Sequence, residues 1–150
     1  MITLRPLVPA DMPRVHELVH ELAIYEKAPE CHTASVADYE RDFQAGIFAG
    51  HAAETHGEIV GITLFYMAYS SWRGRMLYLE DFVVTEAYRG GGIGQALFDA
   101  FLEEARQREC VLCKWQVLDW NEPALRFYRR QNALLESEWL NGKLFLSARV

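Results

Sequence analysis

Apolar residues recur along this chain with two different spacings, and the changes between them predict alternating helices and strands. Val15, Leu18, Val19 and Leu22 lie three or four residues apart, which is the spacing of one helix face. Asp11 and Pro13 suit the N-terminus of that helix. A second, shorter helix is predicted over residues 34–44, and Gly46 is expected to end it.

Strands are predicted where apolar runs are bounded by turn residues. In chain order they are Ile2–Arg5, Phe48–Glu54, Glu58–Tyr69, a strand ending at Val84, Val111–Val117, Glu138–Asn141 and Lys143–Ser147. His56-Gly57 predicts one hairpin turn, and Asn141-Gly142 predicts a closing hairpin between the last two strands.

Two more helices complete the predicted order. One follows the glycine-rich stretch 89–95, and the other opens at Asn121-Glu122-Pro123, where proline is tolerated in the first turn. The order βααβββαβαββ indicates an α/β or α+β fold with a mixed sheet and helices on both faces, the first of these two helices linking parallel strands. A length of 150 residues suggests a single domain, 1–150.

Composition narrows the range of partners. The formal net charge of −6 argues against nucleic acid and suits a cationic substrate. Arg126, Arg129 and Arg130 are expected on a solvated helix face, although one or two could approach a cofactor phosphate. The longest uncharged apolar run, residues 59–69, is too short to cross a bilayer, and no signal-peptide pattern occurs, so we expect a cytoplasmic protein that does not bind membranes.

Cysteine use points to a reducing compartment. The chain has three cysteines, too few for a disulfide framework. Cys110 and Cys113 form C-x-x-C, but no second ligand pair exists, so no metal site is expected and the motif is interpreted as the start of a buried strand.

The stretch 89–95 is the strongest chemical signal. It follows a predicted strand and opens a helix, the arrangement in which backbone N–H groups hold a phosphate. A nucleoside-triphosphate loop would need Lys after Gly94, where Gln95 stands, and a dinucleotide loop would need Gly or Ala at Leu97. The third pattern, Arg89-x-x-Gly92-x-Gly94, resembles the pyrophosphate motif of the GNAT superfamily of acetyl-CoA-dependent N-acetyltransferases; the alternative is a glycine-rich turn without a ligand.

Three segments extend this resemblance over nearly the whole chain: Leu77–Phe82, Tyr88–Gly94 and Trp120–Tyr128. Together they resemble the spermidine/spermine N1-acetyltransferase family and its thialysine N-acetyltransferase relatives, and residues 21–26 fit the same family. The resemblance implies a homodimer, a seven-stranded mixed sheet, and acetyl-CoA bound where two central strands splay.

The resemblance also implies which residues bind the cofactor. The pantetheine amides would meet the backbone of Phe82, Val83 and Val84, and Asn121, Glu122, Pro123 and Ala124 would flank the cofactor. The pyrophosphate would lie against Arg89, Gly90, Gly91, Gly92, Ile93, Gly94 and Gln95.

Acetyl transfer to an amine needs a base, an oxyanion donor and an acid for the leaving thiolate. Tyr128 matches the family's catalytic tyrosine and suits the acid, the alternative being a core tyrosine. Glu80 matches the acidic residue beside the amine and could accept its proton, the alternative being a structural carboxylate paired to an arginine or to backbone amides. Adjacent strand residues point to opposite faces, so Asp81 is expected to be the structural member of the pair. The amide of Val83 or Val84 could bind the oxyanion if a bulge frees it from the ladder.

The amine pocket is expected to include Tyr25, Glu26 and Trp72, although Trp72 could instead pack or contact a dimer partner. No cysteine is placed as an acyl carrier, so direct transfer in a ternary complex is expected. The polyamine enzymes carry acidic residues where this chain has Ser70 and residues 140–142, which favours a short amine, a diamine or a thialysine-like amino acid over spermine. Asn132 replaces a family glycine, which the left-handed conformation tolerates.

Overall fold

The computed structural model describes residues 1–147 of the chain. They fall into two compact units, the first from Met1 to Trp115 and the second beginning at Gln116, and each is described by itself. No helix in residues 1–147 combines the length and the apolar character needed to span a membrane.

The first unit contains five strands, three α-helices and three short 3-10 turns. The strands are β1 (Thr3–Pro6), β2 (Ala49–Thr55), β3 (Glu58–Ser70), β4 (Gly74–Val84) and β5 (Leu112–Trp115). The helices are α1 (Met12–Tyr25), α2 (Val36–Gln44) and α3 (Ile93–Gln107), with 3-10 turns η1 (Pro9–Asp11), η2 (Pro29–Cys31) and η3 (Glu86–Tyr88). The second unit contains α4 (Glu122–Arg130).

The strands form one mixed sheet in the order β1-β2-β3-β4-β5. The first four strands pair antiparallel, and β4 pairs parallel with β5 through the crossover helix α3, as the sequence predicts. The expected count of seven strands is wrong for the described residues, since the sheet has five.

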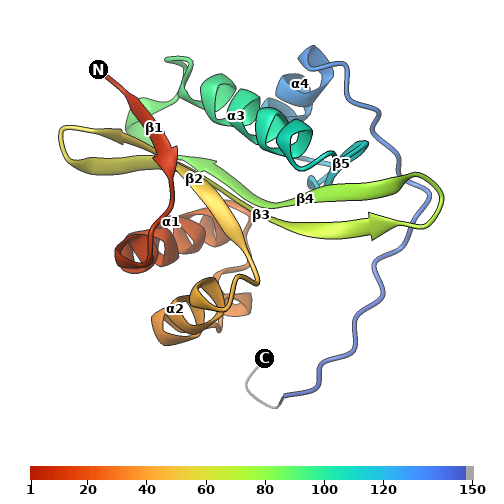
Figure 1. Ribbon diagram of the computed structural model, residues 1–150, viewed down its shortest axis with the longest axis horizontal. Coiled ribbons are helices and arrows are strands. Elements are labelled where there is room, and N and C mark those ends of the chain that lie inside the picture. The colour runs from red at the N-terminus through yellow and green to blue at the C-terminus, as the bar shows by residue number, and fades with distance from the viewer. Residues whose placement is uncertain (148–150) are drawn as a thin grey trace. The chain divides into compact units, whose positions relative to one another are not determined.

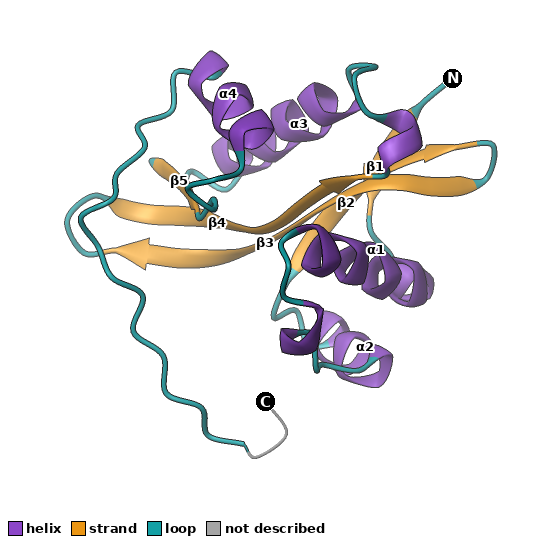
Figure 2. Cartoon of the chain, turned by 180° about the vertical axis from the view of Figure 1, so that it is seen from behind, coloured by secondary structure: helices purple, strands orange, loops and turns teal. Residues whose placement is uncertain are grey.

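Helices cover both faces of this sheet, which confirms the predicted layering. Figures 1 and 2 show α1 and α2 on one face and α3 on the other. The spacing of the α1 apolar face explains its position, because Val15, Leu18 and Val19 pack with Ile62 and Val83 of the sheet. On the opposite face Leu97, Phe98 and Phe101 of α3 are almost fully buried. Because the two cores lie on either side of β3 and β4, these strands are fixed from both faces.

The helix starts follow local capping chemistry. The side-chain oxygen of Ser35 accepts a hydrogen bond from the backbone N–H of Asp38, and the Asp38 carboxylate accepts one from the Ser35 N–H. This reciprocal pair satisfies two donors at the start of α2. Asn121 caps α4 in a similar way, accepting from the N–H of Ala124.

The predicted closing hairpin is wrong: residues 133–146 have no regular secondary structure. A two-residue hairpin turn of the predicted kind needs positive φ at both central residues, and neither Asn141 nor Gly142 has it. Trp139, Leu140, Leu144 and other apolar side chains here are exposed, so this segment has no apolar face packed against the rest of its unit. An isolated two-stranded hairpin is marginal in water, and the turn signal alone therefore does not form it.

Candidate active site

The glycine-rich loop forms an open cradle in front of α3. Gly90 and Gly92 have φ of 82° and 90°, which glycine adopts readily. No heavy atom of the described residues lies within 4 Å of a Cβ built on either glycine, so the space beside them is open. Gly92 is the N-cap of α3, and no side chain caps the helix. The first-turn N–H groups of this helix therefore suit a phosphate, and the pyrophosphate of acetyl-CoA fits the residues present.

Arg89 is held at the mouth of the cradle. Its Nε donates to the carbonyl of Val84 at 2.9 Å, and its guanidinium lies 5.6 Å from the centre of the Tyr25 ring. Tyr25 ends α1, so a residue expected at the amine pocket and one expected at the pyrophosphate meet here. The guanidinium leaves a fixed positive charge beside the loop.

Parallel pairing in the sheet ends before this loop. Pairing between β4 and β5 runs from Met76 to Leu79 on β4 and ends there, although β4 continues to Val84. The backbone of Phe82, Val83 and Val84 consequently has β3 on one side and no ladder to β5 on the other. A strand edge without a paired neighbour is where an extended group such as pantetheine can add hydrogen bonds.

A β-bulge at Glu80 changes the expected orientation of the acidic pair. Leu79 pairs with Phe65 and Asp81 pairs with Leu64, so Glu80 is the extra residue on β4. The expectation that Glu80 and Asp81 point to opposite faces is therefore wrong, because the bulge interrupts the alternation. Both carboxylates act on the tyrosines of the α1–α2 side of the sheet. The bulge also lies before Val83 and Val84, whose pairing with β3 stays regular, so it does not free their amides.

The carboxylates on this side form an acidic subsite, defined here as Glu26, Glu80 and Asp81. Burial, reinforced by the negative charges of Glu80 and Glu26, raises the pKa of Asp81 to about 7. Burial also raises the pKa of Glu26, the residue that follows α1. Glu80 itself is exposed. The subsite therefore combines an exposed carboxylate with a largely buried one, whose pKa lies near neutral pH.

Tyrosines surround the subsite, and the sequence reasoning did not identify them. The Tyr66 hydroxyl donates to Glu80 Oε1 at 3.1 Å, and the Tyr66 ring stacks on Tyr78 with centroids 5.3 Å apart. Burial and the Glu80 charge raise the pKa of Tyr66 to about 12, so its hydroxyl stays protonated at neutral pH. Burial, then Asp81 and Glu80, raise the pKa of Tyr39 of α2. Tyr78 pairs with Tyr66 across the two strands. This pairing depends on the register of β3 and β4, so the local sequence pattern could not reveal it.

The structure does not bring Trp72 to the acidic subsite of its own chain. Trp72 lies at the tip of the β3–β4 hairpin and is 82% exposed. Glu80 lies six residues after Gly74 along β4, a distance of roughly 20 Å at about 3.3 Å per residue. Glu26, by contrast, lies near Asp81, as its effect on that carboxyl shows.

The second unit holds the remaining predicted residues. Tyr128 is 7% exposed and shares the buried face of α4 with Leu125. Asn121 is buried at the start of the helix, whereas Glu122 and Pro123 are exposed and Ala124 is partly buried. The basic residues that follow are exposed, as expected of a solvated face: Arg126, Arg129 and Arg130. Asn132 has φ of 61°, which confirms the left-handed conformation expected there.

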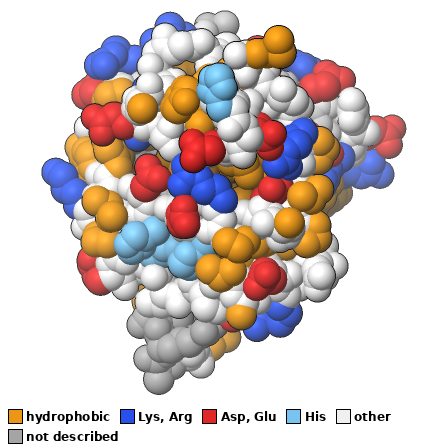
Figure 3. Space-filling model, turned by 90° about the vertical axis from the view of Figure 1, so that its left-hand side faces the viewer, with side chains coloured by type: hydrophobic (Ala, Val, Ile, Leu, Met, Phe, Trp, Pro, Cys, Tyr) orange, Lys and Arg blue, Asp and Glu red, His pale blue; other side chains and the backbone are white. Residues whose placement is uncertain are grey.

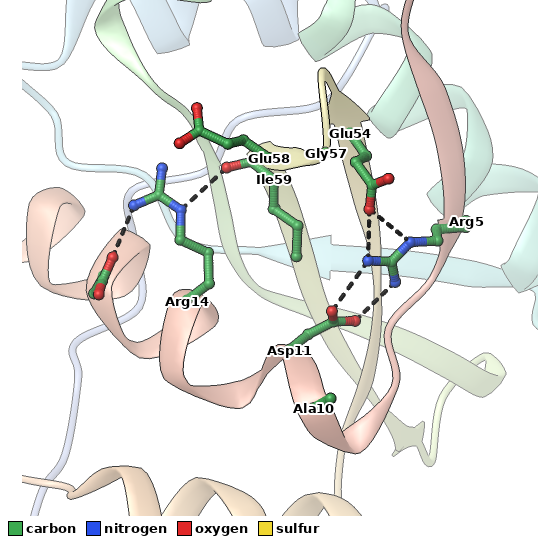
Figure 4. Close-up of a pocket in the computed structure, with 9 residues that line it drawn as sticks. Arg5, Ala10, Asp11, Arg14, Glu54, Gly57, Glu58 and Ile59 are labelled. Carbon is green, nitrogen blue, oxygen red and sulfur yellow. Dashed lines mark hydrogen bonds and ion pairs between the residues drawn. The ribbon is translucent and has the colours of Figure 1, made fainter.

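A polar hollow of about 380 Å³ lies elsewhere in the first unit, between β1, the start of α1 and the β2–β3 turn. Figure 4 shows Arg5 between Asp11 and Glu54, with its guanidinium donating to both carboxylates. Arg14 donates to the carbonyl of Ile59 on the other side. These charges already satisfy one another and tie β1 to β2, so the hollow is a structural ion-pair network.

Neither metal nor thiol chemistry is arranged in the first 147 residues. No group of three or more His, Cys, Asp or Glu side chains among them has the geometry to hold a metal ion. Cys110 and Cys113 are free, and burial raises the pKa of Cys113 to about 11. That thiol is protonated at neutral pH and is a poor nucleophile.

A mixed sheet whose parallel β4–β5 pairing ends at Leu79, beside a glycine-rich loop and an uncapped helix, is typical of an enzyme of the acetyltransferase class. Residues 12–133 match the Acetyltransferase (GNAT) family. The chain belongs to this family, whose members generally use acetyl-CoA, and it is an N-acetyltransferase.

Individual relatives agree with this assignment. The chain is 32% identical over 149 residues to a thialysine N-epsilon-acetyltransferase of Bos taurus, covering 91% of this chain and 88% of that protein. It is 27% identical to an L-ornithine N5-acetyltransferase of Arabidopsis thaliana, with 91% and 81% covered. An aminoglycoside acetyltransferase structure from an uncultured soil metagenomic sample has a TM-score of 0.77 at 23% identity, covering 98% of this chain and 99% of that one, which shows a shared fold.

Proposed function

We propose that this enzyme transfers the acetyl group of acetyl-CoA to a primary amine of a small molecule, a short diamine or a thialysine-like amino acid. One observation carries the proposal. Pairing between β4 and β5 ends at Leu79, and the bulge that gathers the carboxylates is at the next residue, Glu80. The opening for an acyl donor and the negative charge for an amine therefore belong to the same stretch of strand.

The acidic subsite supplies charge and a base for the amine. A primary amine arrives as an ammonium, which has no lone pair for attack. Glu80 is exposed and attracts the cation, while Tyr66 fixes its carboxylate. Asp81 is suited to accept the proton, because burial raises its pKa to about 7 and a base near the working pH is the most effective. This proposal keeps Glu80 beside the amine but gives the base role to Asp81, which the sequence analysis expected to be structural.

Acetyl-CoA, when bound, supplies an activated acyl group on a thiol leaving group. The first-turn amides of α3, which no side chain caps, would hold its pyrophosphate, with Arg89 beside them. We assign Tyr128 to the delivery of a proton to the departing thiolate, since a phenol is a neutral donor at pH 7. Direct transfer needs no acyl-enzyme, and the protonated thiol of Cys113 agrees with that.

The names of the relatives support a short amine. The Bos taurus protein is named for thialysine and the Arabidopsis thaliana protein for ornithine, and both compounds carry a primary amine at the end of a short chain. The tyrosines Tyr66 and Tyr78 line an acidic subsite with aromatic surface, which favours a cation with a short apolar stem.

We also propose a homodimer. Met67, Tyr69 and Trp72 lie exposed along the end of the β3–β4 hairpin, which Figure 1 shows extending beyond α1, α2 and α3. Exposed aromatic and Met side chains of this kind are typical of interface cores. Light scattering after size exclusion tests the proposal, and a monomer for the wild type at micromolar concentration contradicts it.

Thiol release from acetyl-CoA tests the function against thialysine, ornithine, lysine, short diamines, spermidine, spermine and a lysine peptide. We expect turnover of the short amines and little turnover of spermine. Asp81→Asn should lower turnover with every amine while acetyl-CoA still binds. Efficient spermine turnover would refute the choice of a short amine, and tight acetyl-CoA binding without turnover of any amine would favour a binding module.

A further inference from the structure

Three histidines and a tyrosine form a connected cluster on the α1–α2 side of the first unit. The histidine cluster consists of His16 and His20 of α1, His32 of the α1–α2 connection and Tyr39 of α2. His20 Nδ1 and His32 Nδ1 are 3.1 Å apart, and His32 Nε2 is 3.1 Å from the Tyr39 hydroxyl. The His16 and His32 rings lie 4.4 Å apart. Figure 3 shows histidine side chains side by side on one face of the molecule.

The cluster fastens the segment that joins α1 to α2. His16 Nε2 lies 2.7 Å from the carbonyl oxygen of Ala34, and His32 is held between α1 and α2 by both of its ring nitrogens. Residues 27–35 are thereby anchored at His32 and Ala34. The segment begins after Glu26 and leads to Tyr39. Glu26 raises the pKa of Asp81, and the charge of Asp81 raises the pKa of Tyr39. The cluster thus anchors the segment that links two sides of the acidic subsite.

The contact between His20 and His32 requires at least one neutral ring. Two facing Nδ1 atoms share one hydrogen, so one ring must donate and the other must accept. When both rings are protonated, two N–H groups face each other and the hydrogen bond is lost. Burial, His16 and His20 lower the pKa of His32, which means that the closed arrangement favours neutral His32. By linkage, the stability of the closed arrangement is present above the ordinary histidine pKa of about 6.5 and is lost as the pH falls below it.

The charged groups around the cluster come from three elements. His16 and His20 face His32 from α1, Tyr39 faces it from α2, and Glu80 and Asp81 of β4 act on the far side of Tyr39. Protonation of Asp81 weakens the acidic subsite over a similar pH range, so an experiment must separate the two effects.

We propose that the histidine cluster is a proton-operated clamp: with neutral rings it holds residues 27–35 beside the acidic subsite, and ring protonation releases them and lowers affinity for the amine. Its effect on the amine rests on the function proposed above, whereas release of the segment does not. A pH-dependent clamp would restrict acetylation to neutral and alkaline conditions more sharply than a single carboxylate can.

Hydrogen exchange tests the clamp without any substrate. After correction for the intrinsic pH dependence of exchange, we expect protection of residues 27–35 to fall about tenfold between pH 7.5 and pH 5.5, while the β3–β4 hairpin does not change. His32→Gln should abolish this pH dependence, and the matched control His56→Asn, in the exposed β2–β3 turn, should retain it. Tyr39→Phe keeps all three rings, so it should loosen the segment at pH 7.5 but retain the pH response. The proposal is overturned if protection of residues 27–35 does not change with pH in the wild type, or if it falls equally with pH in His32→Gln.

Kinetics test the consequence for the amine. Below pH 6.5 the logarithm of kcat/KM for the amine should fall with a slope near two in the wild type, from Asp81 and the cluster, and near one in His32→Gln. If the wild type and His32→Gln have equal slopes while protection of residues 27–35 still depends on pH, the clamp is not coupled to amine binding. Absence of turnover with any amine counts against the proposed function, and the exchange result still decides the clamp.

Discussion

Asp81→Asn should stabilise the folded protein at alkaline pH, although it removes a charged residue from the proposed active site. Burial raises the pKa of this carboxyl from 3.8 to about 7. The folded protein therefore holds a proton between pH 4 and pH 7 that the unfolded chain releases. Folding becomes less favourable as the pH rises through this window, and the full cost is present above pH 7.

The magnitude follows from the size of the pKa change. At 1.36 kcal/mol for each pKa unit, a move from 3.8 to about 7 corresponds to about 4 kcal/mol. Asp81 keeps some contact with solvent, so we expect a gain of about 2–4 kcal/mol at pH 8. Near pH 4 both proteins are neutral at this position, and the gain should approach zero.

Urea unfolding of wild type and Asp81→Asn at several values between pH 4 and pH 9 measures this difference. Glu80→Gln is an informative companion, because the Glu80 charge helps to raise the Asp81 pKa and its removal should shift the pH midpoint of the effect downward. A stability difference that is constant across the pH range, or a less stable Asp81→Asn at pH 8, would refute the reasoning about this carboxylate.

Three other substitutions test separate parts of the molecule. Tyr128→Phe should reduce turnover about 10²-fold, with acetyl-CoA affinity by calorimetry nearly unchanged; unaltered turnover removes this hydroxyl from the mechanism. Gly92→Ala should weaken acetyl-CoA binding at least about tenfold, because the added Cβ enters the open cradle. Gly46→Ala is the matched control, since Gly46 also has a positive φ and open surroundings. It should cost similar stability and leave acetyl-CoA binding intact. Arg5→Met should cost about 1–3 kcal/mol in urea unfolding at pH 7, because it leaves buried Asp11 without its guanidinium. Burial raises the pKa of Asp11, and Arg5 is the main group that lowers it. The stability lost in Arg5→Met should therefore fade as the pH falls below 4 and Asp11 is protonated. A loss of stability that persists below pH 4 contradicts the ion-pair explanation.

Local pattern predicted most elements of the first unit because their residues act within one turn or one strand. The face of α1 depends on neighbours a few positions away, and so does the glycine-rich loop before α3. The second unit shows the limit of such reasoning. Asn141-Gly142 favours a hairpin, but a hairpin also needs an apolar face to pack, which the turn sequence does not supply.

The bulge at Glu80 escaped prediction for a related reason, since it is a property of two paired strands. A trace of it exists in β4, where apolar residues occupy Leu77 and Leu79 and then Phe82 and Val84. This change of phase marks one inserted residue, but Val83 is apolar as well and hides it. The register with β3 was needed to show that both carboxylates serve the same face.

The bulge also explains why an unfavourable carboxylate belongs at this point of the sheet. In a regular strand Asp81 would lie alone on its face, and a buried charge without a partner is costly. Here its neighbours are Glu80 and Glu26, which increase the cost instead of relieving it. A bound ammonium would reverse the sign of that interaction, because it faces three carboxylates at once and favours the ionised form of Asp81. Under the proposed function, the cost of ionising Asp81 in the free protein would therefore be offset when a cation binds, and the same ionised carboxylate would be the base that removes the proton from the ammonium.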